Sequence, residues 1–320
     1  MMRGQAGLRL LLVVPTLLAI LFVLFALMNF APGDPVSAFV GDYPVPDAYR
    51  QAVIETYSLD ASFWQQFLAY LGQLLQGNLG YSYASSADVT TLIGSRLPAT
   101  LILVLSGMAV GALLGILVGL VSAVISRRGA DAAINTTVLV AFAVPGFWLG
   151  QILVLLFAVK LQWFPASGLH SYGVEGLQLF ADSLWHLVLP VTALCVLEFA
   201  SIARIMRQST FDVLAMDYIT TAELQGLSRR RIVLRHVLRN ASLPAITVIG
   251  YRFGQALAGA LLIEKIFGWP GMGLLLEEAV LRRDTQTILG VVLVIAVLVL
   301  AANVLVDITY RIADPRIRRG

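Results

Sequence analysis

The chain has 320 residues, of which 58% are hydrophobic and only 13% are charged, and its mean hydropathy is +0.84. A soluble domain normally carries about 25% charged residues, so the composition excludes an ordinary soluble fold and indicates a membrane protein. The arginines flank apolar segments instead of lining a polar face, which argues against nucleic-acid binding. The single cysteine, Cys195, lies in an apolar run and excludes a disulfide within the chain.

Six stretches are long and apolar enough to cross a bilayer, since a transmembrane helix needs about 20 mostly apolar residues. They cover residues 10–30, 100–125, 134–159, 184–203, 243–263 and 288–308. The first is longer than the apolar core of a secretory signal, and no small-residue cleavage site follows it, so we expect it to be retained. The sequence therefore predicts an all-α, polytopic membrane protein with six transmembrane helices.

The basic residues predict the orientation of these helices. With the N-terminus inside, 15 of the 22 Lys and Arg residues lie in inner segments, 6 lie in outer segments, and Arg252 lies within a span. Inner loops carry the excess of positive charge in membrane proteins. An even number of spans then places both termini in the cytoplasm.

The spans divide the chain into three parts. Residues 1–30 form an N-terminal tail and the first transmembrane helix, residues 31–97 form an outer segment, and residues 98–320 form a five-helix core. The outer segment predicts two short helices, Asp47–Tyr57 and Phe63–Leu75, because the second has apolar and aromatic residues at helical spacing. We interpret it as an extracytoplasmic helical cap, which either shields the ends of the spans or docks a partner.

The inner loop 206–242 is the most informative segment. Residues 218–225 predict a short helix with Asp217 as its N-cap, and Gly226 suits the left-handed position that closes it. Ser228 can cap a second, basic amphipathic helix over residues 229–240. This pattern is typical either of an interfacial helix held by anionic lipid headgroups or of a helix that transmits force from a cytoplasmic motor.

Seven different short motifs are spread along almost the whole chain. They are Pro32-Gly33-Asp34-Pro35, Gly77-Asn78-Leu79-Gly80-Tyr81-Ser82, Pro145-Gly146-Phe147-Trp148, Phe164-Pro165-Ala166-Ser167-Gly168, Ile263-Glu264-Lys265-Ile266-Phe267, Trp269-Pro270-Gly271-Met272-Gly273 and Asp314-Pro315-Arg316. With the inner loop, they resemble the dipeptide/oligopeptide/nickel permease branch of ABC importers, and the long outer segment is similar to the first permease of the pair. The chain departs from the family's Glu-Ala-Ala…Gly loop, because Thr220-Thr221-Ala222 precede Gly226.

The resemblance implies the type I ABC importer permease fold in a bacterial plasma (inner) membrane. It implies a second permease, two ATPase subunits that bind ATP and Mg, an extracytoplasmic solute-binding protein and surrounding membrane lipid as partners. The chain itself would need no cofactor, and the solute would be a di- or oligopeptide or a related small molecule. The residues that would couple to an ATPase are Asp217, Tyr218, Thr220, Thr221, Ala222, Glu223, Gly226, Leu227 and Ser228.

Ionisable residues within spans are candidates for the translocation path, because burying one in hydrocarbon costs at least about 2.5 kcal/mol. Glu198 and Arg252, with the nearby Gln255, either line the path or form an internal polar pair. Asp307 lies near an inner end and suits a pair with Arg311 at i+4.

Small residues and prolines in the spans predict packing and bending. Gly107, Gly111, Gly115 and Gly119 recur at i+4, as do Gly250 and Gly254, and such stripes favour close helix packing. Pro145-Gly146 and Pro190 are expected to kink their helices.

The sequence offers no chemistry of its own. Neither lysine lies in a phosphate-binding loop, and the scattered His170, His186 and His236 do not predict a metal site. Two other classes remain as alternatives, namely an ion-coupled carrier built around Glu198 and Arg252 and an integral-membrane enzyme.

Overall fold

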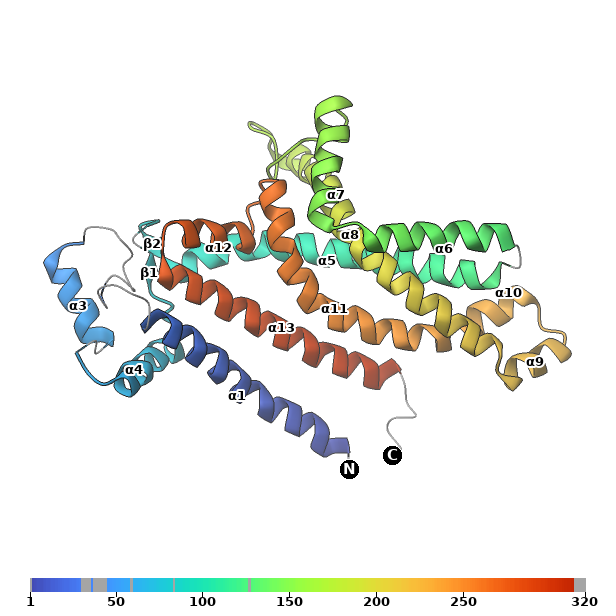
Figure 1. Ribbon diagram of the computed structural model, residues 1–320, viewed down its shortest axis with the longest axis horizontal. Helices are drawn as coiled ribbons and strands as arrows, with labels where there is room; N and C mark the ends of the chain where they lie inside the picture. Colours follow the sequence, from blue (N-terminus) through green and yellow to red (C-terminus); the bar gives the residue numbers. More distant parts are fainter. Residues whose placement is uncertain are drawn as a thin grey trace. The chain divides into compact units, whose positions relative to one another are not determined.

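The computed structural model describes residues 2–29, 36, 45–57, 60–82, 84–125 and 128–313 (Figure 1). Side chains are described in a smaller set, which begins at Val14 and ends at Leu305. The motifs Pro32-Gly33-Asp34-Pro35 and Asp314-Pro315-Arg316 lie outside the described residues. The side chains of Asp307 and Arg311 do as well, so their expected pair remains a prediction.

The described chain is almost entirely helical, as the sequence predicts. The helices are α1 (Met2–Asn29), α3 (Asp47–Tyr57), α4 (Phe63–Leu75), α5 (Val89–Val124), α6 (Arg128–Ala143), α7 (Gly146–Leu153), η1 (Val154–Lys160), α8 (Gly176–Leu214), α9 (Asp217–Leu224), α10 (Arg229–Arg231), η2 (Ile232–Val237), α11 (Leu238–Ile266), α12 (Met272–Leu281) and α13 (Thr285–Ala313). The all-α prediction misses a small antiparallel hairpin, β1 (Tyr81–Ser82) with β2 (Ala87–Asp88). Two paired residues per strand are too short for the alternation that identifies a strand in a sequence.

Among the described residues, four helices are long and apolar enough to cross a membrane: Val89–Val124, Gly176–Leu214, Arg229–Ile266 and Thr285–Leu305. Ala132–Ala143 and Gly146–Lys160 make a fifth candidate, bent by 99°, and α1 contributes a shorter apolar stretch, Val14–Leu27. The spans predicted at residues 100–125, 134–159, 184–203, 243–263 and 288–308 therefore all fall on apolar helices.

The bend confirms the predicted kink at Pro145-Gly146. Pro145 has an extended backbone (φ −63°, ψ 130°), which ends α6 and lets α7 begin in a new direction. Gly146 then approaches α8 so closely that a Cβ would lie 2.5 Å from Cδ1 of Leu197. Pro190 lies inside α8, which continues through it as one helix, and the expected kink at this position remains a prediction.

The contacts divide the chain into two compact units, Met1–Ala99 with Pro270–Leu300 and Thr100–Trp269 with Ala301–Gly320. In the first unit, aromatic rings of α1 and α4 stack around Phe25, which is fully buried with Phe67 and Tyr70. The two short helices α3 and α4 lie where the sequence predicts them. At the start of α4 the Gln65 side chain accepts a hydrogen bond from the Ser62 N–H (3.1 Å).

The first unit also joins the hairpin to the start of α13. Asp284 is buried and accepts hydrogen bonds from the Thr287 N–H (3.2 Å), the Thr287 hydroxyl (2.7 Å) and the Ser82 hydroxyl. Asp284 is therefore both the N-cap of α13 and the anchor of β1.

The second unit is a helical bundle around α8. α5, α6, α7 and α11 all pack against α8, and α9 connects α8 to α10 and α11 at one end of the bundle (Figure 1). The predicted break between an amphipathic helix ending at residue 240 and a span beginning at 243 is wrong. Arg229–Ile266 is one helix, because Pro244 is accommodated within it and the π-helical turn η2 continues directly into α11.

Candidate coupling segment and translocation path

The predicted coupling residues fall on α9 and the turn that follows it. The predicted N-cap is wrong by one residue, since Met216 is in the extended cap position (φ −81°, ψ 142°) and Asp217 is the first helical residue. An acidic side chain in the first turn still interacts favourably with the helix dipole.

Gly226 closes α9 as the sequence predicts. It is left-handed (φ +77°), its N–H donates to the Glu223 carbonyl (2.9 Å), and the Leu227 N–H donates to the Ala222 carbonyl (3.2 Å). These two bonds define a Schellman motif, which uses glycine because a Cβ is disfavoured at positive φ. The motif fixes the angle at which the chain leaves α9.

One face of α9 is anchored and the other is exposed. Ile219 and Ala222 are buried in a cluster that includes Met206 and Val213 of α8 and Ile232 of η2. The Asn240 side-chain amide also donates to the Tyr218 hydroxyl (3.1 Å), which joins α9 to α11. The exposed residues of the segment are Asp217, Tyr218, Thr220, Thr221, Glu223, Leu224, Gln225, Gly226 and Ser228.

The sequence reasoning missed Leu224, which is 85% exposed at the end of α9. Leu224 lies one turn after Thr220 and Thr221, so it shares the exposed face of α9 with predicted coupling residues. Helical spacing could have indicated its exposure, because Leu224 is two residues after the buried Ala222 and therefore lies on the opposite face of the helix.

The structure brings Glu198 of α8 and Arg252 of α11 together. Arg252 Nε donates to Glu198 Oε2 (2.6 Å), while Nη2 lies 3.3 Å from both Glu198 Oε1 and the Leu197 carbonyl oxygen. Of the two alternatives, the internal polar pair is therefore present. Both carboxylate oxygens contact the guanidinium, so the two charges compensate each other within the apolar bundle.

The third path candidate, Gln255, does not contact this pair in any hydrogen bond of the structure, and it is exposed on α11. It belongs to a stripe of exposed residues at helical spacing, Thr247, Tyr251 and Gln255, which Pro244 and Ala258 extend at its two ends. Tyr251 is 69% exposed. Polar side chains on the outside of a membrane helix favour contact with water or protein over contact with hydrocarbon.

The glycine stripe of α5 packs on α8, as expected for small residues at i+4. A Cβ at Gly107 would lie 2.6 Å from Leu194 Cδ2, and one at Gly115 would lie 2.8 Å from Ile202 Cβ. At Gly119 the nearest atom would be the Ala203 carbonyl oxygen at 2.5 Å. These contacts confirm a packing face within the subunit.

A second buried acid was missed. Glu264 lies within α11 instead of outside the span, is fully buried, and accepts a hydrogen bond from the Thr100 hydroxyl (2.6 Å). No local pattern indicates this contact, because the two residues are 164 positions apart.

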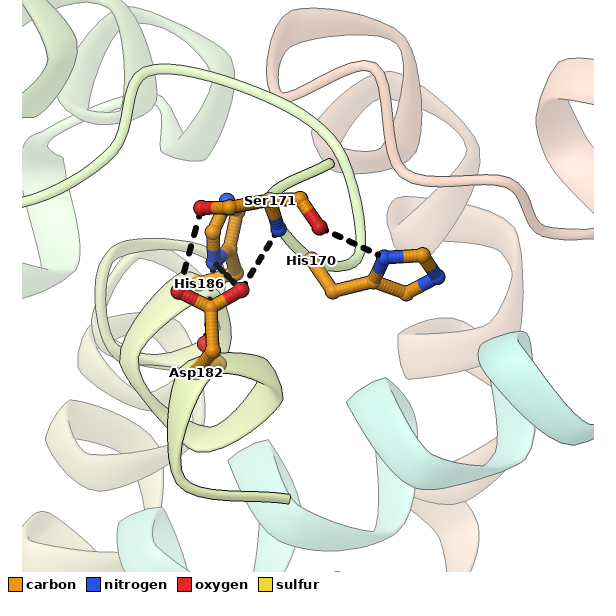
Figure 2. Close-up of polar contacts among 4 residues, drawn as sticks. All are labelled: His170, Ser171, Asp182 and His186. Atoms are coloured by element: carbon orange, nitrogen blue, oxygen red, sulfur yellow. Dashed lines mark hydrogen bonds and ion pairs between the residues drawn. The ribbon is translucent and has the colours of Figure 1, made fainter. Parts of the chain in front are cut away.

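A polar cluster holds the loop 161–175 to α8 (Figure 2). The Ser171 N–H and hydroxyl donate to Asp182 at 2.5 and 3.1 Å, and His186 Nδ1 lies 3.5 Å from Asp182 Oδ2. The Gly168 N–H donates to the Phe267 carbonyl (2.9 Å), which joins the same loop to the end of α11. Within the described residues, no three His, Cys, Asp or Glu side chains are grouped so that they could hold a metal ion.

These features define a helical membrane protein with a partly exposed helix α9 and a polar pair in its bundle, and two family models identify its class. Residues 115–319 match the binding-protein-dependent transport system inner membrane component, and residues 6–104 match the N-terminal model of such membrane components. The chain belongs to this family of binding-protein-dependent transport permeases.

Named relatives cover the chain from end to end. The di/tripeptide transport system permease protein DppB of Pseudomonas aeruginosa (strain UCBPP-PA14) is 39% identical over 328 residues, with 97% of each chain covered. The oligopeptide transport system permease protein AppB of Bacillus subtilis (strain 168) is 37% identical over 310 residues, again with 97% of each covered. A solved structure, "Crystal structure of an amino acid ABC transporter with histidines", is 18% identical, with a TM-score of 0.49 over 69% of this chain and 94% of that chain.

Proposed function

We propose that this permease is one of two membrane-spanning subunits of an ATP-driven importer of short peptides. The peptide class is supported by the relatives, which are named as permeases for di- and tripeptides or for oligopeptides and cover 97% of this chain. A solute-binding protein delivers the peptide from outside, and a second permease completes the path. Two cytoplasmic ATPase subunits bind ATP and Mg, and this chain contributes no ATPase site.

In this proposal the chain crosses the bacterial plasma membrane six times, with both termini in the cytoplasm. The excess of basic residues in the inner segments supports this orientation. Residues 31–97 then form an extracytoplasmic cap, and α9 lies on the cytoplasmic side.

The observation that carries the mechanism is the geometry of α9. Its buried face is fixed to α8 and η2, its exposed face is free for an ATPase groove, and its Schellman turn leads into one continuous helix that reaches Arg252. An ATPase subunit that binds the exposed face of α9 therefore moves α8 and α11 when it moves itself. This movement opens the translocation path alternately to the two sides of the membrane. The residues assigned to coupling are Asp217, Tyr218, Thr220, Thr221, Ala222, Glu223, Leu224, Gly226, Leu227 and Ser228.

Co-purification in mild detergent tests this function. The tagged wild-type chain is expected to bring down a second permease and ATPase subunits, and the complex is expected to hydrolyse ATP. Leu224→Asp, which alters only an exposed side chain, should release the ATPase subunits while the second permease stays bound. A wild-type chain that purifies alone and transports solute without ATP would instead establish an ion-coupled carrier.

A further inference from the structure

The two side chains of the Glu198–Arg252 pair differ in exposure. The Glu198 side chain is 3% exposed, whereas that of Arg252 is 19% exposed. The contacts of Arg252 use Nε and Nη2, so the carboxylate binds one edge of the guanidinium and compensates its charge from the buried side. The partly exposed Arg252 side chain therefore carries no uncompensated charge.

The neighbouring surface of α11 is polar and uncharged. Arg252 is the only charged residue in the sequence from 241 to 263. Thr247, Tyr251 and Gln255 are exposed in a stripe. Arg252 comes one residue after Tyr251 and three residues before Gln255, so it lies beside that stripe on α11. Hydroxyl and amide groups can bond a peptide backbone, and they attract neither sign of charge.

We propose that the Glu198–Arg252 pair and the Thr247–Tyr251–Gln255 stripe form a charge-neutral wall of the translocation path. Glu198 acts as a specificity-determining residue, because it cancels the field of Arg252 and lets cationic and anionic peptides pass alike. This inference rests on the proposed peptide import. Without compensation, a unit charge about 8 Å from a peptide side chain, at an effective dielectric constant of about 20, would change passage roughly tenfold to thirtyfold.

The test measures uptake by the intact complex in proteoliposomes. The probes are three tripeptides that differ only at the central residue, which is alanine, lysine or glutamate. The readout is the ratio of lysine-peptide to glutamate-peptide uptake relative to wild type. Glu198→Gln is expected to lower this ratio about a hundredfold or more, because it slows the lysine peptide and speeds the glutamate peptide by about tenfold or more each. The double variant Glu198→Gln/Arg252→Gln should return the ratio to within about twofold of wild type.

Variants at the exposed Gln255 provide a second test in case the Glu198 and Arg252 variants of the protein do not fold. Gln255→Lys should lower the ratio, and Gln255→Glu should raise it, because each adds one charge to the stripe without removing a buried partner. Gln208→Lys is the matched control, since Gln208 is an exposed glutamine of α8 outside the stripe, and it should leave the ratio unchanged.

The possible outcomes distinguish a failure of the proposed peptide import from a failure of the proposed charge-neutral wall. If the wild-type complex takes up none of the three peptides, the proposed peptide import fails. If it takes them up, but both Gln255 variants leave the ratio unchanged, the neutral-wall proposal is overturned. A Glu198→Gln variant that slows all three peptides equally would also overturn it, because the pair would then only hold α8 to α11.

Discussion

Gly111 of α5 lies directly against Glu198 of α8, so closely that a Cβ at Gly111 would be 2.8 Å from Glu198 Cβ and 2.9 Å from the Cys195 carbonyl oxygen. The buried acid is therefore enclosed by α5 on one side and by Arg252 of α11 on the other. The position of Glu198 depends on the absence of a side chain at residue 111.

Gly111→Ala is expected to destabilise the protein by about 2 kcal/mol, because the α8 backbone oxygen cannot move away as a flexible side chain could. Thermal unfolding in detergent measures the effect. Gly94→Ala is the matched control on the same helix, where an added Cβ meets nothing within 4 Å. Since alanine favours helix over glycine by up to about 1 kcal/mol, Gly94→Ala should be neutral or stabilising. Equal losses in both variants would contradict the close-packing account.

The turn after α9 gives a prediction about coupling. Gly226 has φ +77° with open space around it, so a substitution there acts through backbone strain and not through a clash. Gly226→Val should reorient Leu227 and reduce transport per ATP hydrolysed several-fold, whereas Gly226→Asn should retain most coupling, because asparagine tolerates the left-handed conformation. Parallel assays of ATP hydrolysis and peptide uptake measure this ratio. Valine and asparagine variants with the same ratio would show that the turn conformation does not matter.

The Asp284 cap gives a prediction about the first unit. Asp284→Ala should lower stability by about 2 kcal/mol, since it removes the N-cap of α13 and leaves the buried Ser82 hydroxyl without its acceptor. Ser82→Ala alone should cost less, because Asp284 keeps its bonds to Thr287. A double-mutant cycle measures the coupling, and strictly additive losses would rule out the Ser82–Asp284 interaction as a contributor.

The loop cluster can be examined by hydrogen exchange. Asp182→Asn removes the anionic acceptor of the Ser171 N–H, so exchange at Ser171 should accelerate several-fold. Gly168 should change less, since its N–H donates to Phe267 and not to Asp182. Asp212→Asn, at an acid that bonds Gln208 elsewhere on α8, is a control that should leave both amides unchanged. Unchanged exchange at Ser171 in Asp182→Asn would exclude a role for this acid in holding the loop.

Local patterns were sufficient for much of the fold. The apolar runs placed the long helices, α3 and α4 were predicted with their observed bounds, and Gly226 marked the end of α9. The i+4 glycines of α5 predicted a packing face, although their partner helix was not identifiable. Each of these features depends on residues within one or two turns of each other.

The features that sequence reasoning missed depend on distant residues. Asp284 and Glu264 are separated from their partners, Ser82 and Thr100, by 202 and 164 positions. The short helix α12 was not predicted, because it follows a proline-glycine turn and is too short for a clear apolar period. The Glu198–Arg252 pair was one of two alternatives, since spacing alone does not show that α8 and α11 are neighbours.

The π-helical turn η2 has a consequence for how this chain can change in length. Each of its i→i+5 rings encloses one residue more than an α-helical ring, so the turn stores an additional residue between Gly226 and Arg252. A one-residue deletion within Ile232–Val237 can be absorbed by conversion to α-helix, with Arg252 still directed at Glu198. The same deletion elsewhere in Arg229–Arg252 would turn every later side chain by about 100°. The register between α9 and the Glu198–Arg252 pair therefore depends on the number of residues in this helix, which substitutions leave unchanged and most insertions and deletions alter.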